Sequence, residues 1–129
     1  MYNFLILLGM IFCHIIDDYY LQGVLAKFKQ KEWWKNNCPD KLYRHDYIMA
    51  LFMHSFSWSA SIMIIPTLYI LYNNINFSFV IIFMFFMNII THMLVDNLKA
   101  NYKVINMVQD QIIHILQIYI TWVVFVEVI

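Results

Sequence analysis

The sequence is poor in charge, in glycine and in cysteine, and the first shortage excludes a whole class of protein. Charged residues make up 12% of the 129 residues, whereas soluble domains carry about 25%. Because so few charged residues cannot cover a surface that faces water, we exclude a soluble domain. Eight Lys and Arg residues balance eight Asp and Glu residues, and this balance argues against a nucleic-acid partner. The two cysteines, Cys13 and Cys38, predict no disulfide framework.

Apolar residues take the place of the missing charges. They account for 63% of the chain, and four stretches approach the length needed to cross a hydrocarbon core of ~30 Å as helices. These stretches show no sustained alternation of apolar and polar residues, which favours helices over membrane strands. They cover roughly residues 4–26, 47–72, 77–98 and 104–128. We therefore predict an all-α protein, an integral membrane four-helix bundle forming a single domain over residues 1–129.

The basic residues predict the orientation of this bundle. They fall between the first and second spans, at Lys27, Lys29, Lys31, Lys35, Lys41 and Arg44, and between the third and fourth, at Lys99 and Lys103. In a four-span protein these two connections lie on one side of the membrane. The positive-inside rule places that side in the cytoplasm. We expect a protein of the bacterial inner membrane, with both termini outside.

The long connection between the first two spans contains the pair Trp33-Trp34, flanked by lysines. Tryptophan and lysine together are typical of segments that lie at the headgroup layer, so an amphipathic segment is one interpretation. A solvated basic loop fits the same residues equally well.

Ionisable residues inside the predicted spans indicate a functional site, because they are costly in lipid. A His and an Asp stand four residues apart three times, which places each pair on one helix face. The pairs are His14 with Asp18, His92 with Asp96, and Asp110 with His114. His54 lies alone in the second span, while Gln22 and Lys99 extend the first and third stripes. All these residues fall in the inner half of the bilayer, and we expect the outer half to be almost purely apolar and aromatic.

Imidazole and carboxylate groups together are ligands for zinc and similar divalent metals. We therefore expect the four stripes to converge on one metal site. The predicted ligands are His14, Asp18, His54, His92, Asp96 and His114. Asp110 is the predicted base or second-layer acid, and Gln22 and Lys99 are predicted substrate contacts. A polar clasp between helices remains the alternative for any single pair.

Structural roles are predicted for three further groups of polar residues. Asp17 lies on a different helix face from Asp18 and is predicted to serve helix packing. His45 and Asp46 are predicted to cap the second span or lie at the interface. The remaining group is Ser55, Ser57, Ser59 and Ser61, which we expect to allow close helix contact.

The ordered motifs His14-x-x-x-Asp18-Tyr-x-Leu-Gln22, His92-x-x-x-Asp96-x-x-Lys99 and Asp110-Gln111-x-x-His114, with a lone His54 between the first two, resemble an uncharacterised family of small bacterial and phage membrane proteins. The resemblance covers essentially the whole chain. It implies a multi-helix membrane fold and a role for these polar positions, but it supplies no substrate. More loosely, the chain resembles membrane-bound metal-dependent hydrolases.

The combined expectation is a metal-dependent hydrolase that acts on a lipid or another amphipathic molecule at the cytoplasmic leaflet. One alternative is a transporter or a proton or metal-ion pathway that uses the same residues. Another is a phage-type membrane interaction protein without catalysis. Membrane lipid is the expected partner, and the sequence leaves a homo-oligomer open.

Overall fold

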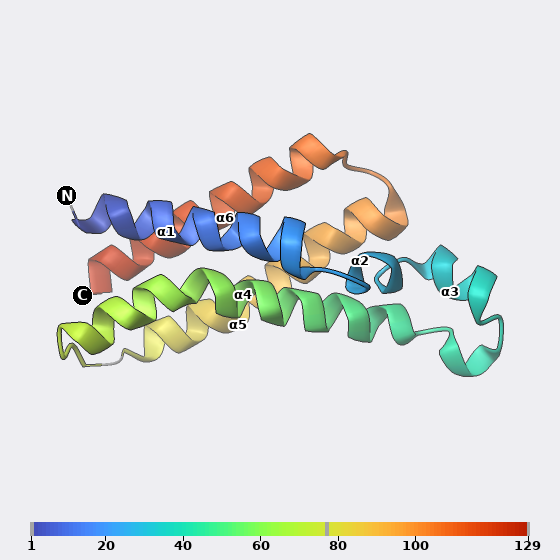
Figure 1. Cartoon of the computed structure of the whole chain (residues 1–129), viewed down its shortest axis with the longest axis horizontal. Helices are drawn as coiled ribbons and strands as arrows, with labels where there is room; N and C mark the ends of the chain where they lie inside the picture. Colours follow the sequence, from blue (N-terminus) through green and yellow to red (C-terminus); the bar gives the residue numbers. More distant parts are fainter. Residues whose placement is uncertain (1, 77, 129) are drawn as a thin grey trace.

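A computed structural model, which describes residues 2–76 and 78–128, shows a bundle of four long helices and confirms the predicted all-α fold. Figure 1 shows the helices running back and forth along one long axis, with both ends of the chain at the same end of the bundle. The long helices are α1 (Tyr2–Ile16), α4 (Asp46–Tyr72), α5 (Phe79–Asn97) and α6 (Met107–Val128). All four belong to segments long and apolar enough to cross a membrane.

The four helices form a closed ring in which each helix packs against two others. α4 packs on α1 and α5, and α6 packs on the same two helices from the other side. The end of the bundle near the two chain ends has an apolar core that includes Met10, Trp58, Ile62, Ile118 and Phe125. Large apolar side chains on the outside, such as those along α5, remain exposed. Lipid would cover such a surface without the cost that water imposes.

Two of the long helices widen into a π-helical turn at the polar end of the bundle. α1 continues into η1 (Asp17–Leu21), and α5 continues into η3 (Leu98–Tyr102). The first helical segment ends at Leu21, whereas the sequence places its end near residue 26. Gly23 has a φ of 52°, a left-handed conformation that glycine adopts without strain. The chain therefore turns at this glycine instead of continuing as a helix.

After this turn the connection to α4 is built from short helices rather than an open loop. They are α2 (Leu25–Phe28), α3 (Lys31–Asn37) and the 3₁₀ turn η2 (Lys41–Tyr43). Asn101 of η3 ties this connection to the bundle: its Oδ1 accepts from the Lys31 backbone N–H at 2.7 Å, and its Nδ2 donates to the Lys29 carbonyl at 2.9 Å. The backbone of this connection is thus held at residues 29 and 31 by η3, which follows α5.

α4 is the longest helix, with 27 residues, and at 1.5 Å per residue it measures about 40 Å. A hydrocarbon core is only about 30 Å thick. A helix longer than the core either tilts or extends beyond it. The end of α4 opposite its short turn to α5 is the one that carries α2 and α3. That end of the bundle is where all eight basic residues are found.

The predicted orientation can be tested with the natural thiol of Cys38, which lies between α3 and η2. In a Cys13→Ser background in a bacterial inner membrane, we expect a membrane-impermeant maleimide to label Cys38 only after the membrane is permeabilised. The control carries Asn76→Cys and Cys38→Ser, which moves the thiol to the exposed α4–α5 turn; it should be labelled in intact spheroplasts. The reverse pattern would show that the basic end faces outward.

Candidate metal centre

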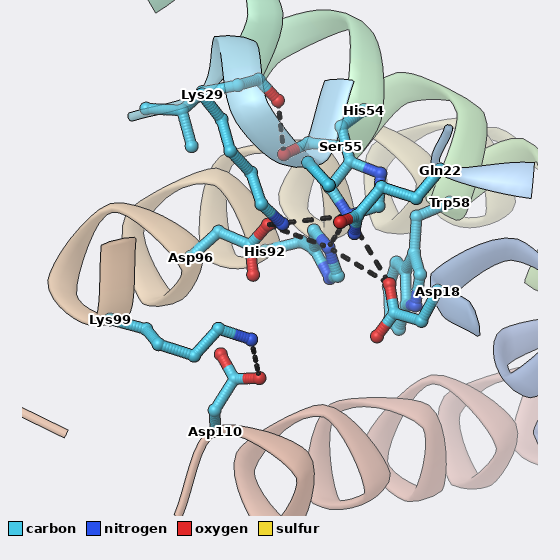
Figure 2. Close-up of polar contacts among 12 residues, drawn as sticks. Asp18, Gln22, Lys29, His54, Ser55, Trp58, His92, Asp96, Lys99 and Asp110 are labelled. Carbon is cyan, nitrogen blue, oxygen red and sulfur yellow. Dashed lines mark hydrogen bonds and ion pairs between the residues drawn. The ribbon is translucent and has the colours of Figure 1, made fainter. Parts of the chain in front are cut away.

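The ionisable residues predicted from the sequence meet inside the bundle at its polar end. His14, His54, His92, Asp96, Asp110 and His114 are all at most 1% exposed. They come from α1, α4, α5 and α6, so every long helix contributes to one buried cluster. Figure 2 shows the side chains of Asp18, His54, His92 and Asp96 directed toward a common centre.

The Nε2 atom of His54 is the point on which this cluster converges. It lies 3.1 Å from Gln22 Nε2, 3.2 Å from His92 Nε2, 3.3 Å from Asp18 Oδ1 and 3.3 Å from Asp96 Oδ2. A ring nitrogen carries either one hydrogen or one lone pair. A single hydrogen bond therefore satisfies at most one of these four neighbours, whereas a cation between them can bind several.

Within the described residues, two overlapping groups have ligand atoms close enough to hold one metal ion. The first contains Asp18, His54 and His92, and the second contains His92, Asp96 and His114. Four ligand atoms at about 2.0–2.1 Å from a tetrahedral zinc ion lie about 3.3 Å from one another. The first group shows separations of 3.2, 3.3 and 4.0 Å, so small movements bring it to that geometry.

Ring orientation distinguishes the two groups. A ring nitrogen directs its lone pair in the plane of the ring, so two imidazoles that bind one ion cannot lie flat on each other. The rings of His92 and His114 are stacked, with centroids 4.0 Å apart and planes 22° apart. The rings of His54 and His92 meet at 62° instead. The first group is therefore better arranged to bind an ion.

Charge gives a second reason for a cation at this centre. The cluster and its immediate neighbours contain four carboxylates and two ammonium groups. They are Asp17, Asp18, Asp96, Asp110, Lys29 and Lys99. With the imidazoles neutral, two negative charges remain uncompensated in a region of low dielectric, where unpaired charge is costly. One divalent cation would supply these two positive charges, as would protons on two of the imidazoles.

Asp17 lies behind His54 and joins η1 to α4, in keeping with the secondary or helix-packing role predicted for it. The π-helical turn η1 brings Asp17 as well as Asp18 into the bundle. Asp17 Oδ1 accepts hydrogen bonds from Ser57 Oγ at 2.7 Å and Ser61 Oγ at 3.0 Å, and its Oδ2 lies 3.8 Å from His54 Nδ1. Carboxylates behind metal-bound histidines orient the ring through a hydrogen bond, and a small movement of Asp17 would bring its Oδ2 to that distance from His54 Nδ1. Ser57 and Ser61 thus position a carboxylate in addition to filling the helix contact.

Lys29 belongs to this site, although the sequence analysis assigned it only to the basic connection between the first two spans. Its side chain is 5% exposed, and its Nζ donates to Asp96 Oδ2 at 2.6 Å. The turn at Gly23 and the short helix α2 direct this lysine back into the bundle. Nothing in the local sequence distinguishes Lys29 from its neighbours Lys27 and Lys31, because the path of the chain after Gly23 decides which lysine enters.

His14 lies in the buried cluster, but its ring nitrogen atoms do not join either group that could hold a metal ion. Its Nδ1 accepts a hydrogen bond from Trp58 Nε1 at 2.8 Å and lies 3.5 Å from Asp18 Oδ2, and it belongs to neither group of metal-binding atoms. Trp58 in turn stacks on the His92 ring, with centroids 4.2 Å apart. Trp58 stands four residues after His54, so helix periodicity alone could have placed it in the site.

Asp110 and Lys99 form an ion pair at one side of the cluster, and Figure 2 shows them apart from the central atoms. Asp110 also accepts a hydrogen bond from Gln111 at 3.1 Å, and its Oδ1 lies 3.4 Å from His114 Nε2. Lys99 therefore neutralises Asp110 instead of pointing into the centre. Gln22, the other predicted substrate contact, lies against His54.

The polar residues extend further along the bundle than the sequence predicts. Asn88, Gln117 and Thr121 are buried between α5 and α6, where the outer half was expected to be almost purely apolar. Gln117 Nε2 donates to Asn88 Oδ1 at 2.9 Å, and Thr121 Oγ1 donates to the same oxygen at 3.1 Å. These bonds satisfy Asn88 Oδ1 across the helix interface, while the buried Asn88 Nδ2 and Gln117 Oε1 have no hydrogen-bond partner among the described residues.

A groove on the lateral surface of the bundle leads toward the cluster. It has a volume of about 490 Å³ and is lined by His14, Ile15, Tyr19, Tyr20, Gln111 and Ile115. Gln111 at its base donates a hydrogen bond to Asp18 Oδ2 at 3.3 Å. The groove therefore connects an apolar, lipid-facing surface to a carboxylate of the first ligand group.

No family model, curated protein or solved structure matches this chain. The resemblance to an uncharacterised membrane protein family stays a prediction, and the functional argument rests on the geometry of the cluster.

Replacing Lys29 tests the buried ion pair with Asp96. We expect Lys29→Met to lower the free energy of unfolding by roughly 3–5 kcal/mol, because it leaves a buried carboxylate without its partner. Unfolding of detergent-solubilised protein in the presence of a chelator measures this effect. Lys103→Met is the matched control, since Lys103 forms an exposed pair with Glu32 at 3.3 Å, for which about 0–1 kcal/mol is expected. Equal losses in both variants would contradict a stabilising role for the buried pair.

Proposed function

We propose that this protein is a membrane-embedded metalloenzyme in which Asp18, His54 and His92 hold one divalent ion, with zinc the best fit. The crowding of four polar atoms around His54 Nε2 carries this proposal. A nitrogen and oxygen ligand set with short separations suits zinc. Asp17 supports His54 from behind, as second-layer carboxylates do in zinc sites.

Three protein ligands leave a fourth position free, which is the arrangement of catalytic rather than structural zinc sites. The ion, when bound, acts as a Lewis acid and lowers the pKa of water to near neutrality. Asp96 is the base in this proposal, in place of Asp110: its Oδ2 lies 3.3 Å from His54 Nε2 and is held by Lys29. Asp110 is less suited to this role because its ion pair with Lys99 lies to one side of the atoms around His54 Nε2 (Figure 2).

The proposed reaction is hydrolysis of an ester or phosphoester in an amphipathic molecule. The oxygen of water joins the acyl or phosphoryl centre, and the bond to the leaving alcohol breaks. One proton of the water passes to Asp96 and then to the alcohol oxygen. The lateral groove supports an amphipathic substrate, since apolar residues such as Ile15 and Ile115 line it and Gln111 at its base reaches Asp18.

The alternative of an ion pathway across the membrane is less well supported. The polar residues Asn88, Gln117 and Thr121 continue the seam outward from the cluster. Beyond them, Phe125 of α6 belongs to the apolar core, together with Ile6 and Ile70. A charged species would have to cross this core, where its desolvation is costly.

Metal content tests the first part of the proposal. Purified protein should bind one zinc ion per chain, and Asp18→Asn or His54→Gln should weaken binding by more than about 100-fold, because each removes a ligand. Asp17→Asn should weaken it by about 10–100-fold. His114→Gln is the control and should change affinity little, as it belongs to the second group alone. Binding that depends on His114 but not on His54 would overturn the assignment, and so would wild-type protein without affinity for zinc.

Hydrolysis is tested separately, with zinc-loaded protein in detergent micelles that contain bilayer lipids. Release of fatty acid or headgroup, followed by mass spectrometry, should fall by about 10²–10⁴-fold in Asp96→Asn, because the variant lacks the base. The same variant should retain zinc within a few-fold. If Asp96→Asn loses the ion, Asp96 is a ligand rather than the base.

A bulky residue in the lateral groove tests substrate access. Ile115→Trp should raise KM without removing zinc, whereas Ile120→Trp, on an exposed position of α6 outside the groove, should leave KM unchanged. Equal effects of both substitutions would contradict entry through the groove.

A further inference from the structure

A second cavity lies in the connection between α3 and α4, separate from the metal centre. Its volume is about 430 Å³. Four cationic side chains line it, namely Lys31, Lys35, Lys41 and Arg44. The one carboxylate in its lining, Asp40, is engaged locally, because its Oδ1 caps η2 by accepting from the Leu42 backbone N–H at 2.8 Å. The cavity therefore has a large positive excess in a chain whose total charge is balanced.

The residues that line the cavity indicate its position relative to the bilayer. Tyr47, in the first turn of α4, and Trp34 both line the cavity. Together with the basic side chains, which we expect at the membrane surface, these aromatic residues place the cavity at headgroup depth. Trp and Tyr residues gather at that depth in membrane proteins.

The walls of the cavity are held in a defined arrangement by aromatic contacts and hydrogen bonds. Trp34 Nε1 donates to the Phe28 carbonyl at 2.6 Å, and the Trp34 and Tyr43 rings are stacked, with planes 18° apart. Lys31 Nζ lies over the rings of Tyr47 and Tyr102, at 4.8 and 4.9 Å from their centroids. The backbone N–H of Lys31 is bound by Asn101, so this wall is joined to the bundle.

We propose that this cavity binds the phosphate of an anionic lipid headgroup. Phosphate is the anion available at headgroup depth, and Arg and Lys side chains bind its oxygens through charge-assisted hydrogen bonds. The acyl chains of the bound lipid extend into the adjoining leaflet. This site is independent of the metal centre, since none of its lining residues is a proposed ligand or base.

Short-chain phosphatidylglycerol, added to detergent-solubilised protein and followed by Trp fluorescence, tests the proposal. Each basic residue near an anionic surface contributes about fivefold in affinity, so Lys35→Gln with Arg44→Gln should weaken binding by about 30-fold. The matched control is Lys27→Gln with Lys103→Gln, which removes the same charge from positions outside the cavity. The control should lose much less affinity than the cavity variant.

Three outcomes would overturn the proposal. Equal loss in both double variants would show diffuse attraction to basic charge rather than a site. Equal binding of short-chain phosphatidylcholine would remove the requirement for an anionic headgroup. Inorganic phosphate that displaces the lipid at equal concentration would identify a site for free phosphate. None of these measurements involves zinc, so their result is independent of the test of the metal centre.

Discussion

The buried carboxylates of the polar end impose the constraint on which the rest of this structure depends. Four carboxylates cannot be buried away from water without positively charged or hydrogen-bonding partners, and every long helix of the bundle contributes polar side chains to this cluster. Lys29, directly after α2, and Lys99 of η3 each pair with one of these carboxylates. Two carboxylates remain without a lysine, and three of the imidazoles belong to groups that could hold a metal ion.

The apolar core and the ionisable cluster lie at different positions along the length of the bundle. One end is packed with apolar side chains and holds the helices together, while the other contains the ionisable cluster. Three buried polar residues that are hydrogen-bonded to one another, Asn88, Gln117 and Thr121, lie between them. A small molecule could reach the cluster from the polar end of the bundle or from its side. The lateral groove beside Gln111 lies on the side.

The fold and the convergence of the histidines follow from the sequence because both depend on helix periodicity. A His and an Asp four residues apart share a face whatever the rest of the chain does, and three such pairs at one depth have to meet in a bundle. The proximity of Asp17 to His54 was not predicted, because neighbouring residues of a regular α-helix point about 100° apart. The π-helical turn η1 alters that relation. Lys29 could not be foreseen either, since a left-handed turn at Gly23 decides where it points.

The surplus length of α4 links this protein to the thickness of the membrane around it. A helix of 27 residues matches a bilayer only by tilting or by leaving some turns outside the hydrocarbon. In a thicker membrane those turns would be drawn inward, and with them Arg44, Asp46 and the short helices attached to them. Hydrophobic mismatch of this kind costs fractions of a kcal/mol per ångström. The length of α4 is thus matched better by a thick membrane, rich in long acyl chains, than by a thin one, because less of the helix has to tilt or lie outside the hydrocarbon.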